Sequence, residues 1–97
     1  MIIVDRIDFA IKEIKSRYSS VADVSYIIHL NKADYDELSE LGLVKKARFG
    51  SRICKVYELE NKDLILIKLI DEEDKSWIEG YYEYLIEKRV QKEVTIL

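Results

Sequence analysis

The stretch Val24-Ser25-Tyr26-Ile27-Ile28-His29-Leu30 decides the fold of this chain, because it supports two structures. β-Branched and aromatic residues dominate it, which favours a strand that would add a fourth member to the sheet expected further along the chain. Val24, Ile27 and Ile28 also fall on one face of a helix that Ser20 would cap. Propensity slightly favours the strand, whereas the hydrophobic pattern permits either structure.

A helix is expected before this stretch, over residues 5 to 18. Ile7, Ile11 and Ile14 recur there at spacings of four and three residues, which is the buried stripe of an amphipathic helix. Asp5 is the expected N-cap, because its carboxylate can accept a hydrogen bond from a free backbone N–H of the first turn.

A second, short helix is expected between Asn31 and Gly42. Asn31 has the side chain of an N-cap, and Asp34 places an acid in the first turn. Gly42 follows at the position where a left-handed backbone ends a helix and lets Leu43 fold back onto Leu38.

Three further strands are expected over residues 43–49, 53–59 and 64–70, joined by turns at Gly50-Ser51 and at 60–63. They predict a three-stranded antiparallel meander. The third of these strands is apolar on both faces except at Lys68, which predicts a central strand covered on both sides.

Residues 72–92 are expected to form a helix that begins with acids and ends with basic residues. Large apolar side chains cover most of its circumference, so a second face is left for another copy of the chain. The sequence therefore predicts a homodimer in which Gly80 allows two backbones to approach. Its interface residues are Trp77, Ile78, Tyr81, Tyr82 and Leu85. Residues 94–97 are expected to form a short strand.

With 97 residues, the chain is too short to build two independent cores. The sequence thus predicts one α+β domain over residues 1–97. Its elements are an N-terminal helix, a short middle helix, a three- to four-stranded antiparallel sheet and a C-terminal aromatic helix.

Composition narrows the class of protein. The net charge of −3 argues against a histone-like coat for nucleic acid, and the longest apolar run, 64–67, is far too short to span a bilayer. No membrane partner is expected. The single cysteine, Cys54, and the lack of a secretory leader predict a cytoplasmic protein. Scarce Gln and Asn beside abundant Lys, Glu and Ile are typical of thermophiles, although the absence of proline is not.

A basic segment is the strongest candidate for a binding site. Five cations and no acid occupy the eleven residues from 45 to 55, with Phe49 at the expected hairpin tip. Such a tip can straddle a phosphate backbone while its aromatic ring contacts a sugar or base. The candidate nucleic-acid-binding residues are Lys45, Lys46, Arg48, Arg52 and Lys55. Alternatively, these cations protect exposed strands from pairing edge to edge.

If residues 20–30 are helical, residues 20–59 resemble winged-helix DNA-binding regulators of the ArsR or MarR kind. Residues 20–33 are similar to the entry of a helix-turn-helix, 38–46 to the end of a recognition helix, and 52–59 to the wing. The resemblance implies DNA binding through that helix and wing. This chain departs from the family between Asn31 and Gly42, which is shorter than the family's recognition helix.

No catalytic residue, metal ligand or cofactor is predicted. His29 is the only histidine and Cys54 the only cysteine, and both are expected to be structural. The sequence therefore predicts a small non-enzymatic binding protein, nucleic-acid-binding or regulatory through its basic hairpin. The alternative is a protein–protein interaction factor of the kind that viruses or mobile elements encode, docking through its aromatic helix.

Overall fold

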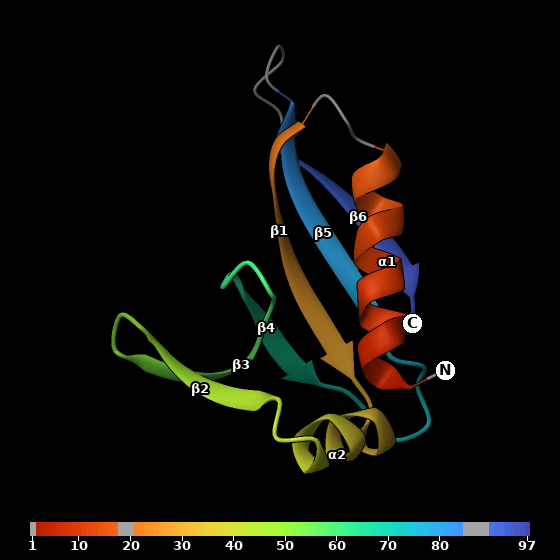
Figure 1. Cartoon of the computed structure of the whole chain (residues 1–97), viewed down its shortest axis with the longest axis vertical. Helices are drawn as coiled ribbons and strands as arrows, with labels where there is room; N and C mark the ends of the chain where they lie inside the picture. Colours follow the sequence, from red (N-terminus) through yellow and green to blue (C-terminus); the bar gives the residue numbers. More distant parts are fainter. Residues whose placement is uncertain (1, 18–20, 85–89) are drawn as a thin grey trace.

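A computed structural model places two helices against a six-stranded mixed sheet (Figure 1). The structure describes residues 2–17, 21–84 and 90–97, with side chains for 2–17, 24–81 and 92–97. The elements in chain order are α1 (Ile3–Arg17), β1 (Val21–Leu30), α2 (Lys32–Glu40), β2 (Val44–Phe49), β3 (Arg52–Glu58), β4 (Leu64–Leu69), β5 (Trp77–Tyr84) and β6 (Val90–Ile96). The strand order is β2-β3-β4-β1-β5-β6, in which β1 and β4 are parallel and the other neighbours antiparallel.

The ambiguous stretch forms β1, so the strand is confirmed and the helical alternative is wrong. β1 lies between β4 and β5 in the middle of the sheet. The segment that would enter a helix-turn-helix is therefore a central strand. The sheet also has six strands rather than three or four, and one of its pairings is parallel.

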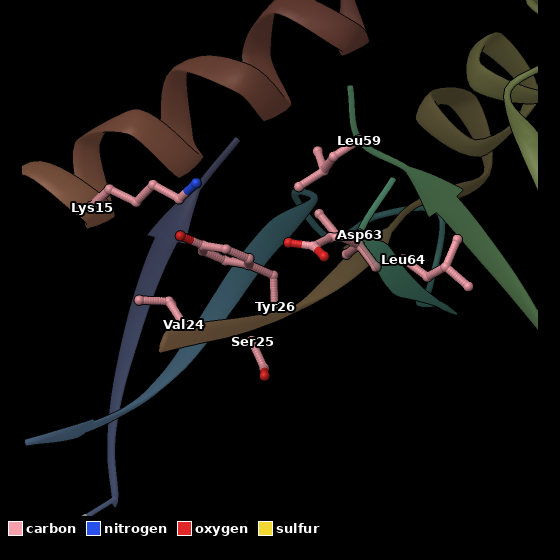
Figure 2. Close-up of a pocket in the computed structure, with 8 residues that line it drawn as sticks. Lys15, Val24, Ser25, Tyr26, Leu59, Asp63 and Leu64 are labelled. Carbon is pink, nitrogen blue, oxygen red and sulfur yellow. The ribbon is translucent and has the colours of Figure 1, made fainter. Parts of the chain in front are cut away.

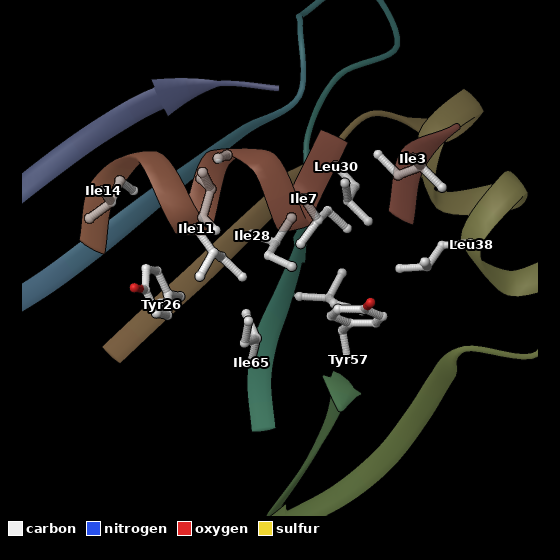
Figure 3. Close-up of a cluster of buried hydrophobic side chains, with 13 residues drawn as sticks. Ile3, Ile7, Ile11, Ile14, Tyr26, Ile28, Leu30, Leu38, Tyr57 and Ile65 are labelled. Atoms are coloured by element: carbon white, nitrogen blue, oxygen red, sulfur yellow. The ribbon is translucent and has the colours of Figure 1, made fainter. Parts of the chain in front are cut away.

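α1 supplies one side of the core, as its isoleucine stripe predicted. Ile7, Ile11 and Ile14 are buried against the sheet (Figure 3). The helix begins at Ile3, so Asp5 lies within its first turn and is not the N-cap. An acid in this turn still interacts favourably with the helix dipole.

α2 begins and ends where the sequence predicted. The Asn31 side chain accepts a hydrogen bond from the backbone N–H of Asp34 at 2.9 Å. Gly42 adopts a left-handed φ of 73°, and the Leu43 N–H donates to the Leu38 carbonyl at 3.2 Å. Neighbouring residues therefore provide hydrogen bonds to backbone groups at both ends of the helix.

β4 is an interior strand, but only one of its faces is covered. Ile65 and Ile67 are buried beside the core, whereas Leu64 and Lys68 are exposed. The expectation of a strand covered on both sides is therefore wrong.

The expected C-terminal helix is also wrong, because β5 and β6 form an antiparallel pair there. Aromatic and β-branched residues favour a strand, and alternate residues of β5 face opposite sides of the sheet. The apolar side chains that would cover all sides of a helix lie instead on the two faces of a strand. Both of these faces are partly buried. The acids at 71–74 lie in the preceding loop, and β6 covers most of the expected strand at 94–97.

Gly80 has a role in this packing rather than in a helix dimer. A Cβ at this position would lie 3.3 Å from Ile14 Cγ2 and also 3.3 Å from Tyr26 Cε1 and Val24 Cγ1. Because Gly80 has no side chain, α1 packs directly against β5. Neither helix in the described part of the chain is long and apolar enough to cross a bilayer.

Candidate nucleic-acid interface

The basic segment forms a hairpin that projects from the sheet. β2 and β3 pair from Val44 opposite Tyr57 to Phe49 opposite Arg52, and Gly50 turns the chain with a φ of 63°. β3 pairs with β4 only over residues 56–58, so the outer part of the hairpin extends beyond the sheet (Figure 1). The hairpin tip is thus accessible from both sides.

The register distributes the five cations over the two faces of the hairpin. Lys46 lies directly opposite Lys55, and Arg48 follows two residues along on the same face. Lys45 and Arg52 belong to the other face. All five cationic residues are exposed, and Phe49 at the tip is 49% exposed.

One acid belongs to this hairpin, and it neutralises one cation. Lys45 Nζ lies 2.6 Å from Glu58 Oε2, and this contact lowers the pKa of the Glu58 carboxyl. Lys55 Nζ lies 4.8 Å from the centre of the Tyr35 ring, a cation–π contact. Five cations and one acid give residues 44–58 a net charge of +4, in a chain whose total is −3.

A second group of side chains lies on the sheet face opposite α1, here called the open face. The rings of His29 and Trp77 stack there in parallel, with centroids 3.7 Å apart. Glu79 Oε2 lies 3.4 Å from His29 Nε2, and the Tyr81 hydroxyl donates a hydrogen bond to the other oxygen of Glu79. The cluster therefore holds a carboxylate between an imidazole and a phenol.

Burial lowers the pKa of His29, and the charges of Lys68 and Lys92 lower it further, against the raising effect of Glu79. His29 is therefore neutral at pH 7. The hydrogen bond to Glu79 raises the pKa of the Tyr81 hydroxyl, which remains a donor. The His29 side chain is packed against Trp77 and is 12% exposed.

The Asp34 carboxylate forms hydrogen bonds that hold parts of the fold together. Its two oxygens accept hydrogen bonds from Arg6 at 2.9 and 3.2 Å, and Ser76 Oγ donates to it at 2.5 Å. These bonds join α1, α2 and the loop residue that precedes β5. Within the described residues, no group of three or more His, Cys, Asp or Glu side chains has the arrangement of a metal site.

A pocket of about 370 Å³ lies on the covered side, between α1, β1 and the start of β4 (Figure 2). The Tyr26 hydroxyl points into it toward Lys15 and finds no hydrogen-bond partner among the described residues. Burial raises the pKa of Tyr26 to about 12, so the hydroxyl stays protonated. Sequence reasoning missed this pocket, because its residues come from separate elements without a common motif.

The predicted interface residues do not share one surface. Trp77 and Tyr81 lie on the open face, whereas Ile78 is fully buried in the core. Tyr82 belongs to β5 but its side chain lies outside the described set, as does all of Leu85. Sequence reasoning missed Lys68 and Lys92 as neighbours of His29, because only the strand register brings them together.

Comparisons with protein-family models, with curated proteins and with solved structures found no match to this chain. The projecting hairpin and the open face are therefore the features from which a function is inferred. The hairpin combines accessibility with an excess of positive charge, and the open face combines aromatic rings with exposed lysines.

Proposed function

We propose that this protein binds nucleic acid and that the β2–β3 hairpin grips the phosphate backbone. The observation that carries the proposal is the charge of the projecting hairpin. Among the ion pairs of the described residues, Lys45 is the one hairpin cation with an acidic partner. Cations without acidic partners on an accessible hairpin attract a polyanion.

The geometry of the hairpin supports contacts on both of its faces. Lys46 and Arg48 offer donors on one face and Arg52 on the other, so phosphates on either side of the tip are within reach. Arg forms two parallel hydrogen bonds with a phosphate. Phe49 at the tip offers a ring to a sugar or base.

The first test is the salt dependence of binding. With three or four phosphates contacted, a plot of log affinity against log salt should have a slope of about −3 to −4 on duplex DNA and about −2 to −3 on a single strand. Fluorescence anisotropy with labelled random oligonucleotides of both forms measures these slopes. An absence of binding by the unaltered protein at low salt would refute the proposal.

A charge-reversal pair localises the contact. Arg48→Glu together with Arg52→Glu should weaken binding by at least about 10-fold, because each substitution replaces an attraction to phosphate by a repulsion. The matched control is Lys12→Glu with Lys15→Glu on α1, which changes the total charge by the same amount on exposed positions remote from the hairpin. Equal losses in the two pairs would mean that net charge, and not the hairpin, governs binding.

A further inference from the structure

The open face carries a continuous row of side chains across five strands. The strand register aligns the members of this row from β3 to β6, and they are Val56, Leu66, Ile27, Glu79 and Val94. A parallel row on one side consists of Lys68, His29, Trp77 and Ile96. On the other side, Ser25, Tyr81 and Lys92 form a third row. Neighbouring strands lie about 4.8 Å apart, so the longest row, which crosses five strands, spans about 20 Å.

This face is unusually apolar for a sheet surface without a covering helix. Leu64, Val94 and Ile96 are 45, 48 and 58% exposed, and the aromatic side chains of Trp77 and Tyr81 are partly accessible. The uncovered face of an antiparallel sheet is ordinarily polar. A contiguous apolar and aromatic surface of this kind is typical of a binding site.

The exposed charged side chains in the described part of the open face are cations. Glu58 is half-buried and paired with Lys45, and Glu79 is only 5% exposed, with a hydrogen bond from the Tyr81 hydroxyl. Arg52, Lys68 and Lys92 belong to the same face and have no acidic partner among the ion pairs of the described residues. The described part of the face is therefore apolar with cations around it, on a chain that is negatively charged overall.

We infer that the open face binds a single-stranded nucleic acid, with bases against Trp77 and Tyr81 and phosphates near Arg52, Lys68 and Lys92. The inference rests on the proposed function of the hairpin and assigns the form of nucleic acid. Sequence-tolerant binding of single strands commonly combines aromatic side chains with a cationic surface along the backbone. A duplex keeps its bases paired inside, so it would leave the apolar rows of this face without a partner.

The hairpin and the open face form one continuous surface. Phe49 and Arg52 lie opposite each other on the face of the hairpin that continues into the open face, because alternate residues of β3 lead from Arg52 to Val56. A single strand gripped at the tip can therefore run across β4, β1 and β5 toward Lys92. At about 20 Å plus the length of the hairpin, this path accommodates a few nucleotides.

Charge disfavours a second copy of the chain as the occupant. A symmetric face-to-face dimer would bring two sets of Arg52, Lys68 and Lys92 into one interface, while in the described part of that face Glu58 is already paired with Lys45 and Glu79 is buried. Like charges brought together in an interface oppose association. A polyanion meets the same cations with attraction.

Trp77 is the only tryptophan of the chain, so its fluorescence reports on this face directly. Titration with an oligothymidylate of about 15 nucleotides at about 50 mM salt should quench it, and this probe should bind at least about 10-fold more tightly than a duplex of equal length. Equal or tighter binding of the duplex, or binding of the single strand without a change in Trp77 fluorescence, would overturn the inference.

Substitutions separate the open face from the hairpin. Lys68→Glu with Lys92→Glu should weaken oligothymidylate binding at least about 10-fold, whereas the α1 control pair Lys12→Glu with Lys15→Glu should stay within about 3-fold. Tyr81→Ala should weaken it about 5-fold or more through lost base contact. Circular dichroism melting of each variant confirms that the compared proteins are folded.

The two pairs of charge reversals distinguish loss of the open-face site from loss of the hairpin site. If Arg48→Glu with Arg52→Glu abolishes binding while Lys68→Glu with Lys92→Glu behaves like the α1 control, the hairpin function stands and the open-face site is refuted. If neither nucleic acid binds at low salt, both are refuted. A light-scattering mass of twice 11.5 kDa that persists with excess oligothymidylate and unquenched Trp77 would place a second copy on the face and refute the single-strand site.

Discussion

The two faces of the sheet are built from alternating residues of the same strands, yet they differ in character. Ile28 and Ile78 face α1 and are completely buried, whereas their chain neighbours Ile27 and Trp77 face the open side and are only partly buried. Figure 2 shows the alternation directly, with Tyr26 and Ser25 pointing to opposite sides of β1. The covered face stabilises the fold, whereas the open face leaves aromatic and charged side chains partly accessible.

The largest difference in stability between the two faces is expected from substitutions of two adjacent isoleucines. Ile28→Ala should lower the free energy of unfolding by about 3 kcal/mol, because it leaves a cavity between β1 and α1. Ile27→Ala removes the same atoms from the open face and should cost about 1 kcal/mol, since that side chain is already partly hydrated. Urea denaturation of both variants measures the difference. Equal losses would mean that the open face is packed as tightly as the core.

A smaller effect should follow from filling the contact between α1 and β5. Gly80→Val should cost about 2 kcal/mol, because its extra carbons meet Ile14 and Tyr26 where even a Cβ is at 3.3 Å. The control is Ser25→Val, which adds a β-branched residue to an exposed position of the open face and should change stability by less than about 0.5 kcal/mol. A neutral Gly80→Val variant would show that α1 can move away from the sheet without loss.

Local signals in the sequence were sufficient for most of the first seventy residues. The isoleucine stripe of α1, the Asn31 cap with Gly42, and the turn at Gly50 each act within a few residues, and each is found as predicted. The C-terminal region failed for a physical reason. Periodicity does not separate a strand with two partly buried faces from a helix that is apolar all round, and the acids at 71–74 imitated a helix start.

In the candidate site, too, local sequence signals identify some features and miss those that depend on strand pairing. The hairpin cations lie within eleven residues of the sequence, so composition alone selects them, whereas their distribution over two faces depends on the pairing of Lys46 with Lys55. The open face joins residues from five strands, and the neighbours Lys68 and His29 are separated by a parallel crossover. Parallel pairing leaves no turn signal in the sequence, so this surface was not predictable from local patterns.

The smallest predicted effect is a pH dependence that arises on the open face. The pKa of His29 lies below its unfolded value of 6.5, because burial lowers it, Lys68 and Lys92 lower it further, and Glu79 offsets them only in part. Above about pH 7.5, a full unit above the unfolded value, His29 is neutral in both states and contributes no pH dependence. Below this pH His29 binds a proton in the unfolded chain but not in the folded protein. The free energy of unfolding should therefore decrease with falling pH until the folded pKa is reached, with a slope of at most about 1.4 kcal/mol per pH unit. Urea denaturation between about pH 7.5 and 5.5 measures this slope, and His29→Gln should flatten it. The same slope in both proteins would assign the pH dependence to groups other than His29.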